Sequence, residues 1–410
     1  MSEWKKVNLG DCCEITSSKR IFFSEYVESG IPFYRSKEII EKGKGEEISH
    51  PLYISKEKYD EIKGKYGVPQ KGDLLLTAVG TLGIPFVVKD DSPFYFKDGN
   101  LVWLKHFQDI DPIFLYYWIK SENGYNALYN IAIGSAQKAL TIAAIKGYEI
   151  PLPPLQTQHR IANILSRYDS LIENYQKQIK LLEEAAQRLY KEWFVDLRFP
   201  GHENTKIVDG VPEGWEKKKL CELFSFVRGK SYTSKELSDE GTIMVNLKNI
   251  QSFGGYKSDV EKHFIGTFKE EQTLMKGDLI MGVTDMTQER RLVGSVALIP
   301  DFKETATFSM DLIKLISFKL PNIYLYCAMR YGDVSRQIAP LANGVNVLHL
   351  KPEAISNIEM VVASDSIIEK FVSYTSKTIE SILSLQSQLR LLTEARDRLL
   401  PKLMSGEITV

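Results

Sequence analysis

The stretch that decides the fold is residues 156–193, QTQHRIANILSRYDSLIENYQKQIKLLEEAAQRLYKEW, which contains neither glycine nor proline. Pro153 and Pro154 lie immediately before it, and proline is well tolerated where a helix begins. Apolar residues recur along the stretch at alternating steps of four and three, which is the pattern of a heptad seam. We therefore expect one long helix of about 35 residues, a rod of roughly 50 Å at about 1.5 Å per residue.

The seam returns about 210 residues later in the chain at the same phase, so a second rod is the natural partner of the first. Each rod leaves its own globular part at its N-terminal end, and this connectivity favours an antiparallel coiled coil. Two ordinary bundle helices, whose seams face separate cores, remain the alternative. The predicted seam residues are Ile161, Leu165, Tyr168, Ile172, Tyr175, Ile179, Leu182, Leu189, Phe371, Ile382, Leu385, Leu389, Leu392 and Leu399.

The repeat extends over the whole chain. Trp4 matches Trp215 with a shift of 211 residues, and the sequence KGDL occurs at both 71–74 and 276–279, where the shift is smaller. An insertion in the second copy, before Gly294, restores the larger shift. Each half therefore carries the same elements in the same order.

Outside the rods, each half consists of short strand-like runs between Gly, Pro and Asp turns, with an aromatic helix candidate at 114–119 in the first. We predict an α+β fold: two pseudo-two-fold related, mixed α/β domains separated by two long helices that form an antiparallel coiled coil. The predicted boundaries are 1–150 and 201–360 for the domains, and 151–200 and 361–410 for the helical spacers.

Composition excludes several classes of protein. The 410 residues include 52 Lys and Arg against 53 Asp and Glu, and 43% are hydrophobic, so the chain is a folded protein without a global basic or acidic bias. The N-terminus lacks the apolar region of an export signal, and the most apolar stretch, 74–88, is interrupted by Gly and Pro. With four scattered cysteines, a cytoplasmic protein with no membrane span is expected.

Catalytic motifs are incomplete. Residues 229–231, GKS, resemble the end of a phosphate-binding loop, but Phe224 stands where the upstream glycine is required. The sequence PPL at 153–155 lacks the preceding Asn or Asp with which amino-methyltransferases grip a flipped base. The six histidines show no metal-ligand spacing. We expect no catalytic residue, no metal site and no enzymatic activity in this chain.

The order of these features resembles the specificity subunit of type I restriction-modification systems. Each half has a tryptophan-led start, a KGDL strand, a glycine segment, a proline-rich helix start and a heptad rod. The resemblance covers essentially the whole chain and is most specific at 150–158, IPLPPLQTQ, and at the rod sequence LEEA of 182–185, repeated as LTEA at 392–395. The second copy departs from the pattern at 361–364, where VVAS replaces the prolines.

The resemblance implies that each globular part is a target recognition domain that reads one half of an asymmetric, bipartite DNA target, while the rods set the unread spacer. It also implies double-stranded DNA, two methyltransferase subunits and restriction subunits as partners. S-adenosylmethionine, ATP and magnesium are then expected on those partner subunits, and no cofactor on this chain.

Base reading needs Arg, Lys, Asn, Gln and Thr on turns that can enter a groove, and phosphate contacts need Lys, Arg and backbone amides. These types cluster at matching places in the two halves. The candidate DNA-binding residues are Lys19, Arg20, Arg35, Ser36, Lys37, Thr77, Thr81, Gln137, Lys138, Lys230, Ser231, Asn246, Lys248, Asn249, Thr287, Gln288, Arg290, Arg291 and Asn346.

Two other functions stay open from the sequence. The duplicated domains could be a structural adaptor that binds proteins and never reads DNA. Alternatively, the chain could be the specificity subunit of another methyltransferase-based defence system.

Overall fold

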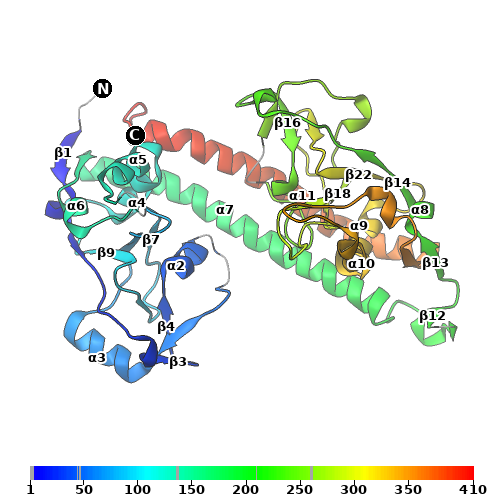
Figure 1. Ribbon diagram of the computed structural model, residues 1–410, viewed down its shortest axis with the longest axis horizontal. Helices are drawn as coiled ribbons and strands as arrows, with labels where there is room; N and C mark the ends of the chain where they lie inside the picture. Colours follow the sequence, from blue (N-terminus) through cyan, green and yellow to red (C-terminus); the bar gives the residue numbers. More distant parts are fainter. Residues whose placement is uncertain (1–3, 44, 46–47, 135–137, 209, 259–261) are drawn as a thin grey trace. The chain divides into compact units, whose positions relative to one another are not determined.

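The computed structural model describes residues 4–43, 45, 48–134, 138–208, 210–258 and 262–410 (Figure 1). The chain forms two compact units, residues 1–173 with 394–410 and residues 174–393. Each unit therefore contains one globular part together with a portion of both long helices. The domain boundaries at 150, 200 and 360 stay a prediction, because the units divide the helices instead of separating them from the domains.

The first unit contains two four-stranded sheets, ordered β2-β9-β6-β7 and β3-β5-β4-β8, and a two-stranded sheet β1-β10. Every strand pair is antiparallel except β4 with β8. Its elements are β1 (Lys5–Asn8), α1 (Leu9–Cys12), β2 (Glu14–Thr16), η1 (Phe23–Glu25), β3 (Tyr26–Val27), β4 (Ile31–Tyr34), α2 (Ser36–Gly43), β5 (Leu52–Ile54), α3 (Lys56–Tyr66), β6 (Leu74–Thr77), β7 (Pro85–Val87), β8 (Tyr95–Phe96), β9 (Leu101–Lys105), α4 (Pro112–Lys120), α5 (Glu122–Ile131), α6 (Ile142–Lys146) and β10 (Glu149–Leu152).

The second unit repeats this topology with sheets β14-β22-β18-β20, β15-β17-β16-β21 and β13-β24, and it adds two short pairs, β11-β12 and β19-β23. The parallel pair recurs as β16 with β21. The predicted duplication is confirmed at the level of strand order. The elements are β11 (Ile207–Val208), β12 (Val211–Pro212), β13 (Glu216–Lys219), α8 (Leu220–Leu223), β14 (Phe224–Arg228), η4 (Ser234–Glu236), β15 (Leu237–Ser238), β16 (Thr242–Val245), η5 (Leu247–Asn249), β17 (Lys262–Phe264), η6 (Glu270–Gln272), β18 (Leu279–Gly282), β19 (Thr284–Asp285), β20 (Val296–Leu298), β21 (Ala306–Phe308), β22 (Leu312–Ser317), α9 (Asn322–Tyr331), α10 (Val334–Ile338), η7 (Ala339–Leu341), β23 (Leu348–His349), η8 (Pro352–Ile355) and β24 (Glu359–Val362).

The duplicated KGDL sequence forms the same turn twice, directly before β6 and β18. Gly72 and Gly277 have φ of 92° and 85°, a conformation that residues with a Cβ rarely adopt. The Asp73 carboxylate accepts a hydrogen bond from the Gln70 amide at 2.9 Å, and Asp278 accepts one from Met275 at 2.9 Å. The turn chemistry, and not only the hydrophobic strand, therefore explains why this sequence occurs twice.

The two long helices are α7 (Leu155–Tyr190), continued by a π-helical turn at Lys191–Val195, and α11 (Asp365–Met404) (Figure 1). In the second unit the Tyr190 ring lies 6.0 Å from that of Phe371, so the end of α7 meets the start of α11. In the first unit Leu165 shares a core with Leu403, so the start of α7 meets the end of α11. The helices therefore run in opposite directions, as predicted.

The fourteen predicted seam residues all lie in α7 or α11, and each is buried or half-buried. A second face of α11 packs on the globular part of its unit, where Gln386 and Arg390 donate to the backbone carbonyls of Tyr256 and Phe302. Helix α11 is thus covered on two faces, a pattern that a strict two-helix seam does not include. The continuous coiled-coil seam stays a prediction.

The start of α7 is fixed by Gln158, whose side chain is fully buried. Its amide nitrogen donates to the carbonyls of Pro153 and Asp109, and its carbonyl oxygen accepts from the Asp111 amide at 2.9 Å. Because Asp111 also caps α4, this one side chain ties the proline-rich segment, α4 and α7 together.

Each globular part is also anchored to the long helices of its own unit by a charged contact. In the first unit, the Tyr117 hydroxyl of α4 and the Arg396 guanidinium of α11 both donate at 2.8 Å to the Asp169 carboxylate of α7. In the second unit, Arg330 of α9 donates to both carboxylate oxygens of Glu183 in α7, at 2.8 and 3.0 Å. Burial and the neighbouring carboxylate raise the pKa of Tyr117, so its hydroxyl keeps the proton that it donates.

Candidate nucleic-acid interface

The same two loops meet in each unit. In the first, the β6–β7 connection pairs with the segment before α6, through bridges from Ala139 to Val79 and to Ile133. In the second, β19 pairs with β23, which brings residues 283–292 against 343–350. We call residues 78–84 with 133–134 and 138–140 the first loop pair, and residues 283–292 with 343–350 the second loop pair. The repeat thus presents two surfaces that are equivalent in backbone but different in sequence.

The second loop pair is held from its base by Asp285, of which 1% is exposed. Its carboxylate accepts from the Thr287 amide and hydroxyl and from the Leu292 amide, at 2.8 to 2.9 Å. At the tip, the Gln288 amide donates to the Val345 carbonyl at 2.8 Å and joins the two loops. The loop is therefore held by the buried Asp285 at its base and by the exposed Thr287 and Gln288 side chains, whereas, among the described residues, the Arg291 and Asn346 side chains make no hydrogen bond that defines its shape.

Five predicted residues meet on this second loop pair: Thr287, Gln288, Arg290, Arg291 and Asn346. All are exposed except Arg290, which is half-buried at a φ of 54°. Arg291 forms an exposed ion pair with Glu289 at 2.6 Å. Such an exposed pair contributes little free energy, so Arg291 can exchange it for another acceptor.

The first loop pair presents different chemistry. Thr81 is exposed, and the Lys138 ammonium lies 3.6 Å from the ring centroid of Tyr129. Tyr129 in turn stacks with Tyr125, whose ring lies beside Gly83 of the loop. Sequence reasoning missed both tyrosines, because it predicted no helix there; their spacing of four residues puts them on one face of α5. Gln137 lies outside the described residues.

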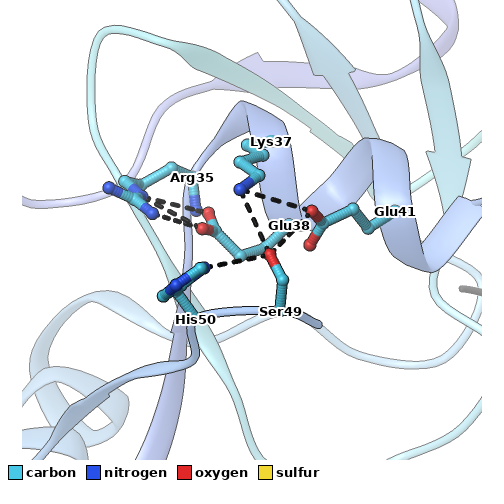
Figure 2. A network of polar contacts seen from close by, with 6 residues as sticks. All are labelled: Arg35, Lys37, Glu38, Glu41, Ser49 and His50. Carbon is cyan, nitrogen blue, oxygen red and sulfur yellow. Dashed lines mark hydrogen bonds and ion pairs between the residues drawn. The ribbon is translucent and has the colours of Figure 1, made fainter. Parts of the chain in front are cut away.

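A second cluster of predicted residues lies at the start of α2 and is shown in Figure 2. The Arg35 guanidinium donates to both carboxylate oxygens of Glu38, and the Lys37 ammonium contacts Ser49 at 3.1 Å and Glu41 at 3.6 Å. Although burial raises the pKa of Glu38, hydrogen bonds from Arg35 outweigh it and lower that pKa. Both cations therefore already have local acidic partners. Nearby, the half-buried Ser36 donates to the Asn100 carbonyl at 3.3 Å.

Lys19 and Arg20 lie between β2 and η1, and we call them, with Tyr66, the Lys19 corner. The Lys19 ammonium lies 4.6 Å from the Tyr66 ring centroid, and Arg20 pairs with Asp98 at 2.9 Å. The equivalent place in the second unit is the Lys230 corner, where Lys230, Ser231 and Lys269 line a hollow of about 340 Å³. Lys248 is exposed on η5.

Three predicted residues have buried side chains that make internal hydrogen bonds, which does not favour a direct contact with DNA. Thr77 is fully buried, and its hydroxyl accepts from the Ile84 amide at 2.9 Å. Asn246 accepts from the Lys248 amide and caps η5, and Asn249 donates to the Lys257 carbonyl. These residues shape the backbone beneath the surface.

Among the described residues, no group of three or more His, Cys, Asp or Glu side chains could hold a metal ion. Over the same residues, no helix is both long and apolar enough to cross a membrane.

Residues 1–184 match the family model described as the type I restriction modification DNA specificity domain. Over this first part the chain is thus similar to type I specificity subunits. The MjaIX specificity subunit of a type I restriction enzyme from Methanocaldococcus jannaschii is 28% identical over 354 residues, covering 83% of this chain and 78% of the relative. A putative type I specificity subunit of Haemophilus influenzae is 34% identical over 189 residues, covering 46% of each chain.

The fold of this chain is similar to a solved structure, the type I restriction-modification S subunit from M. genitalium. The TM-score is 0.61 with 18% identity, over 98% of this chain and 96% of the other. The loop pairs and the two corners are the surfaces on which most of the candidate residues gather.

Proposed function

We propose that this chain is the DNA-specificity subunit of a type I restriction-modification complex in the cytoplasm. Each globular domain reads one half of an asymmetric bipartite target, and the two long helices set the unread spacer between the halves. The chain itself catalyses no reaction. It recruits two methyltransferase subunits and restriction subunits, which carry S-adenosylmethionine, ATP and magnesium.

The observation that carries the proposal is the pair of equivalent loop surfaces with different side chains. Strand order and loop pairing repeat between the units. The first loop pair offers Thr81 and Lys138 beside two tyrosines of α5, whereas the second offers Gln288, two arginines and Asn346. Arginine and glutamine form two-point hydrogen bonds with guanine and adenine, while apolar and aromatic groups favour thymine methyls and stacking. Two equivalent surfaces with unlike chemistry support two unlike half-sites.

The proposal that each domain reads its own half-site is tested with two matched variants. Arg290→Ala with Arg291→Ala is expected to weaken or relax recognition of one half-site, by about 1–3 kcal/mol per lost base contact, and to leave the other half-site unchanged. Thr81→Ala with Lys138→Ala is expected to do the reverse. Single-molecule sequencing of methylated bases in host DNA reads both half-sites in one experiment. Equal loss at both half-sites in either variant would contradict the proposal.

The alternatives are separated by comparing the host methylome with and without this gene. A bipartite, asymmetric methylated motif that disappears with the gene supports a specificity subunit. An unchanged methylome supports a protein-binding adaptor. Loss of methylation without any change in the restriction of unmodified DNA supports a methylation-only or other methyltransferase-based system.

A further inference from the structure

Two adjacent phenylalanines in the first unit, Phe22 and Phe23, are largely exposed to solvent at the turn where η1 begins. Their exposed fractions are 61% and 87%. A single exposed apolar residue is ordinary, but two large neighbouring ones at a loop tip mark a surface that contacts something.

The second unit supplies an internal control, because its equivalent turn, at η4, carries Thr233 and Ser234. In the first unit, the Phe22 amide donates to the Glu25 carboxylate at 2.7 Å, and in the second the Thr233 amide donates to Glu236 at 2.8 Å. The backbone hydrogen bonds of the two turns also match, because the Glu25 amide donates to the Phe22 carbonyl and the Glu236 amide donates to the Thr233 carbonyl. The turn therefore forms without aromatic residues, and stability of the fold does not explain Phe22 and Phe23.

The exposed pair rests on a rigid base. The Phe23 ring lies 5.5 Å from that of Tyr26, and Tyr26 lies 5.2 Å from Phe33, which is fully buried. A column of aromatic rings thus runs from the core to the tip. A side chain supported in this way loses little conformational freedom when it binds.

The surroundings indicate the kind of partner. Lys19 and Arg20 precede the pair by only a few residues and are exposed, and Tyr66 is half-exposed beneath the Lys19 ammonium. An apolar tip flanked by cations suits a ligand that combines an anionic backbone with flat apolar faces. Double-stranded DNA has both, and proteins that insert apolar wedges between base pairs use this combination.

We propose that Phe22 and Phe23 form a wedge that packs against a base step of the half-site bound by the first domain and partly unstacks it, while Lys19 and Arg20 contact the adjacent phosphates. This inference rests on the proposed function and adds to it an unequal deformation of the two half-sites, since the equivalent turn of the second domain carries Thr and Ser. Sequence-dependent ease of unstacking then contributes to recognition at that step.

The test uses the full chain, with its methyltransferase subunits, and duplexes in which 2-aminopurine replaces one base at a time. The wild type is expected to raise 2-aminopurine fluorescence at one step of one half-site. The variant Phe22→Thr with Phe23→Ser, which copies the second domain, should lose that signal and bind DNA about tenfold more weakly, while the salt dependence of binding stays the same. Lys19→Ala should instead reduce the salt slope by about one.

Each other outcome has one meaning. If the variant binds and unstacks DNA like the wild type, the wedge is wrong while the proposed function stands. If DNA binding by the chain is unchanged but a methyltransferase or restriction subunit is lost, the pair is a protein-docking site and the wedge is wrong. If the wild type shows no sequence-specific binding, the proposed function itself fails. Thermal unfolding of the variant checks that its fold is intact, and Thr233→Phe with Ser234→Phe tests whether a second unstacked step can be created.

Discussion

Polar residues of similar types either hold the backbone of this protein or lie exposed on its surface, and the sequence alone does not distinguish the two roles. Asn246 and Arg291 are both typical DNA-contacting types on predicted turns, yet one is buried and the other exposed. The difference lies in local hydrogen bonding. The Asn246 side chain accepts a hydrogen bond from the Lys248 amide and caps η5, whereas the loop of Arg291 is held by the Asp285 carboxylate and leaves the Arg291 side chain exposed. At the scale of one residue, burial and hydrogen-bond partners therefore decide between framework and surface.

The contact of Arg330 with Glu183 gives the clearest stability prediction. Their side chains are 10% and 13% exposed, so each partner leaves a poorly solvated charge if the other is removed. Arg330→Ala is expected to cost about 3–5 kcal/mol of unfolding free energy in urea titrations. The double variant Arg330→Met with Glu183→Leu should recover most of this loss, since it leaves no buried charge. A double variant as unstable as the single one would show that packing, and not charge, dominates the contact.

The contact of Arg35 with Glu38 gives a prediction about pH. Burial alone would raise the pKa of Glu38, but hydrogen bonds from Arg35 lower it below its ordinary value of 4.5. The unfolded chain then binds more protons than the folded one, so the stabilisation is present above pH 4.5 and is lost as the pH falls through the lower folded pKa. Chemical denaturation measures the free energy of unfolding of the wild type and of Glu38→Gln between about pH 6 and about pH 3, a range that brackets the ordinary carboxyl pKa. The wild type should lose its advantage over the variant on acidification, and a constant difference would contradict the assignment.

At the scale of elements, the long helices are predictable because apolar residues at many successive heptad positions each indicate the same helix. Helix α7 begins one residue before the predicted stretch. What the pattern misses is that α11 has a second buried face, because Gln386 and Arg390 are polar and read as solvent-exposed. The surface loops are less predictable still, since no periodicity constrains Phe22 or Phe23. Only alignment of the two copies would have exposed the contrast between Phe22-Phe23 and Thr233-Ser234.

The helix seam is tested by placing a charge within it. Ile179 and Leu389 are 7% and 8% exposed, so Ile179→Asp or Leu389→Asp buries an unpaired carboxylate and should lower the melting temperature by several degrees. Leu181→Asp and Leu391→Asp are matched controls two residues away, at 65% and 51% exposure, and should change stability by about 0.5 kcal/mol or less. Equal melting of the seam variants and their controls would contradict the seam.

At the scale of the whole molecule, the near balance of 52 basic and 53 acidic residues has to be reconciled with DNA binding. Several candidate cations already have acidic neighbours, including Arg20, Arg35, Lys37 and Arg291. Each of these four must give up an acidic partner before it can displace a counterion from DNA. We therefore expect the isolated chain to compete only weakly for the phosphate backbone.

This argument predicts how salt acts on binding. The isolated chain should bind its target weakly, with a shallow dependence of affinity on salt concentration, and the slope should steepen when methyltransferase subunits join and add their own phosphate contacts. Fluorescence anisotropy over a range of salt concentrations measures both slopes. A steep slope for the chain alone would mean that its own cations provide most of the phosphate contacts.

The way Asp285 holds the second loop pair has a consequence for how such a protein changes over generations. The carboxylate fixes the base of the loop through the Thr287 and Leu292 backbone amides, so a side chain such as that of Arg291 can be exchanged while these bonds stay in place. Mutation at the tip is then buffered against misfolding. A lineage can then change the exposed chemistry of this loop one substitution at a time while the framework beneath it stays the same.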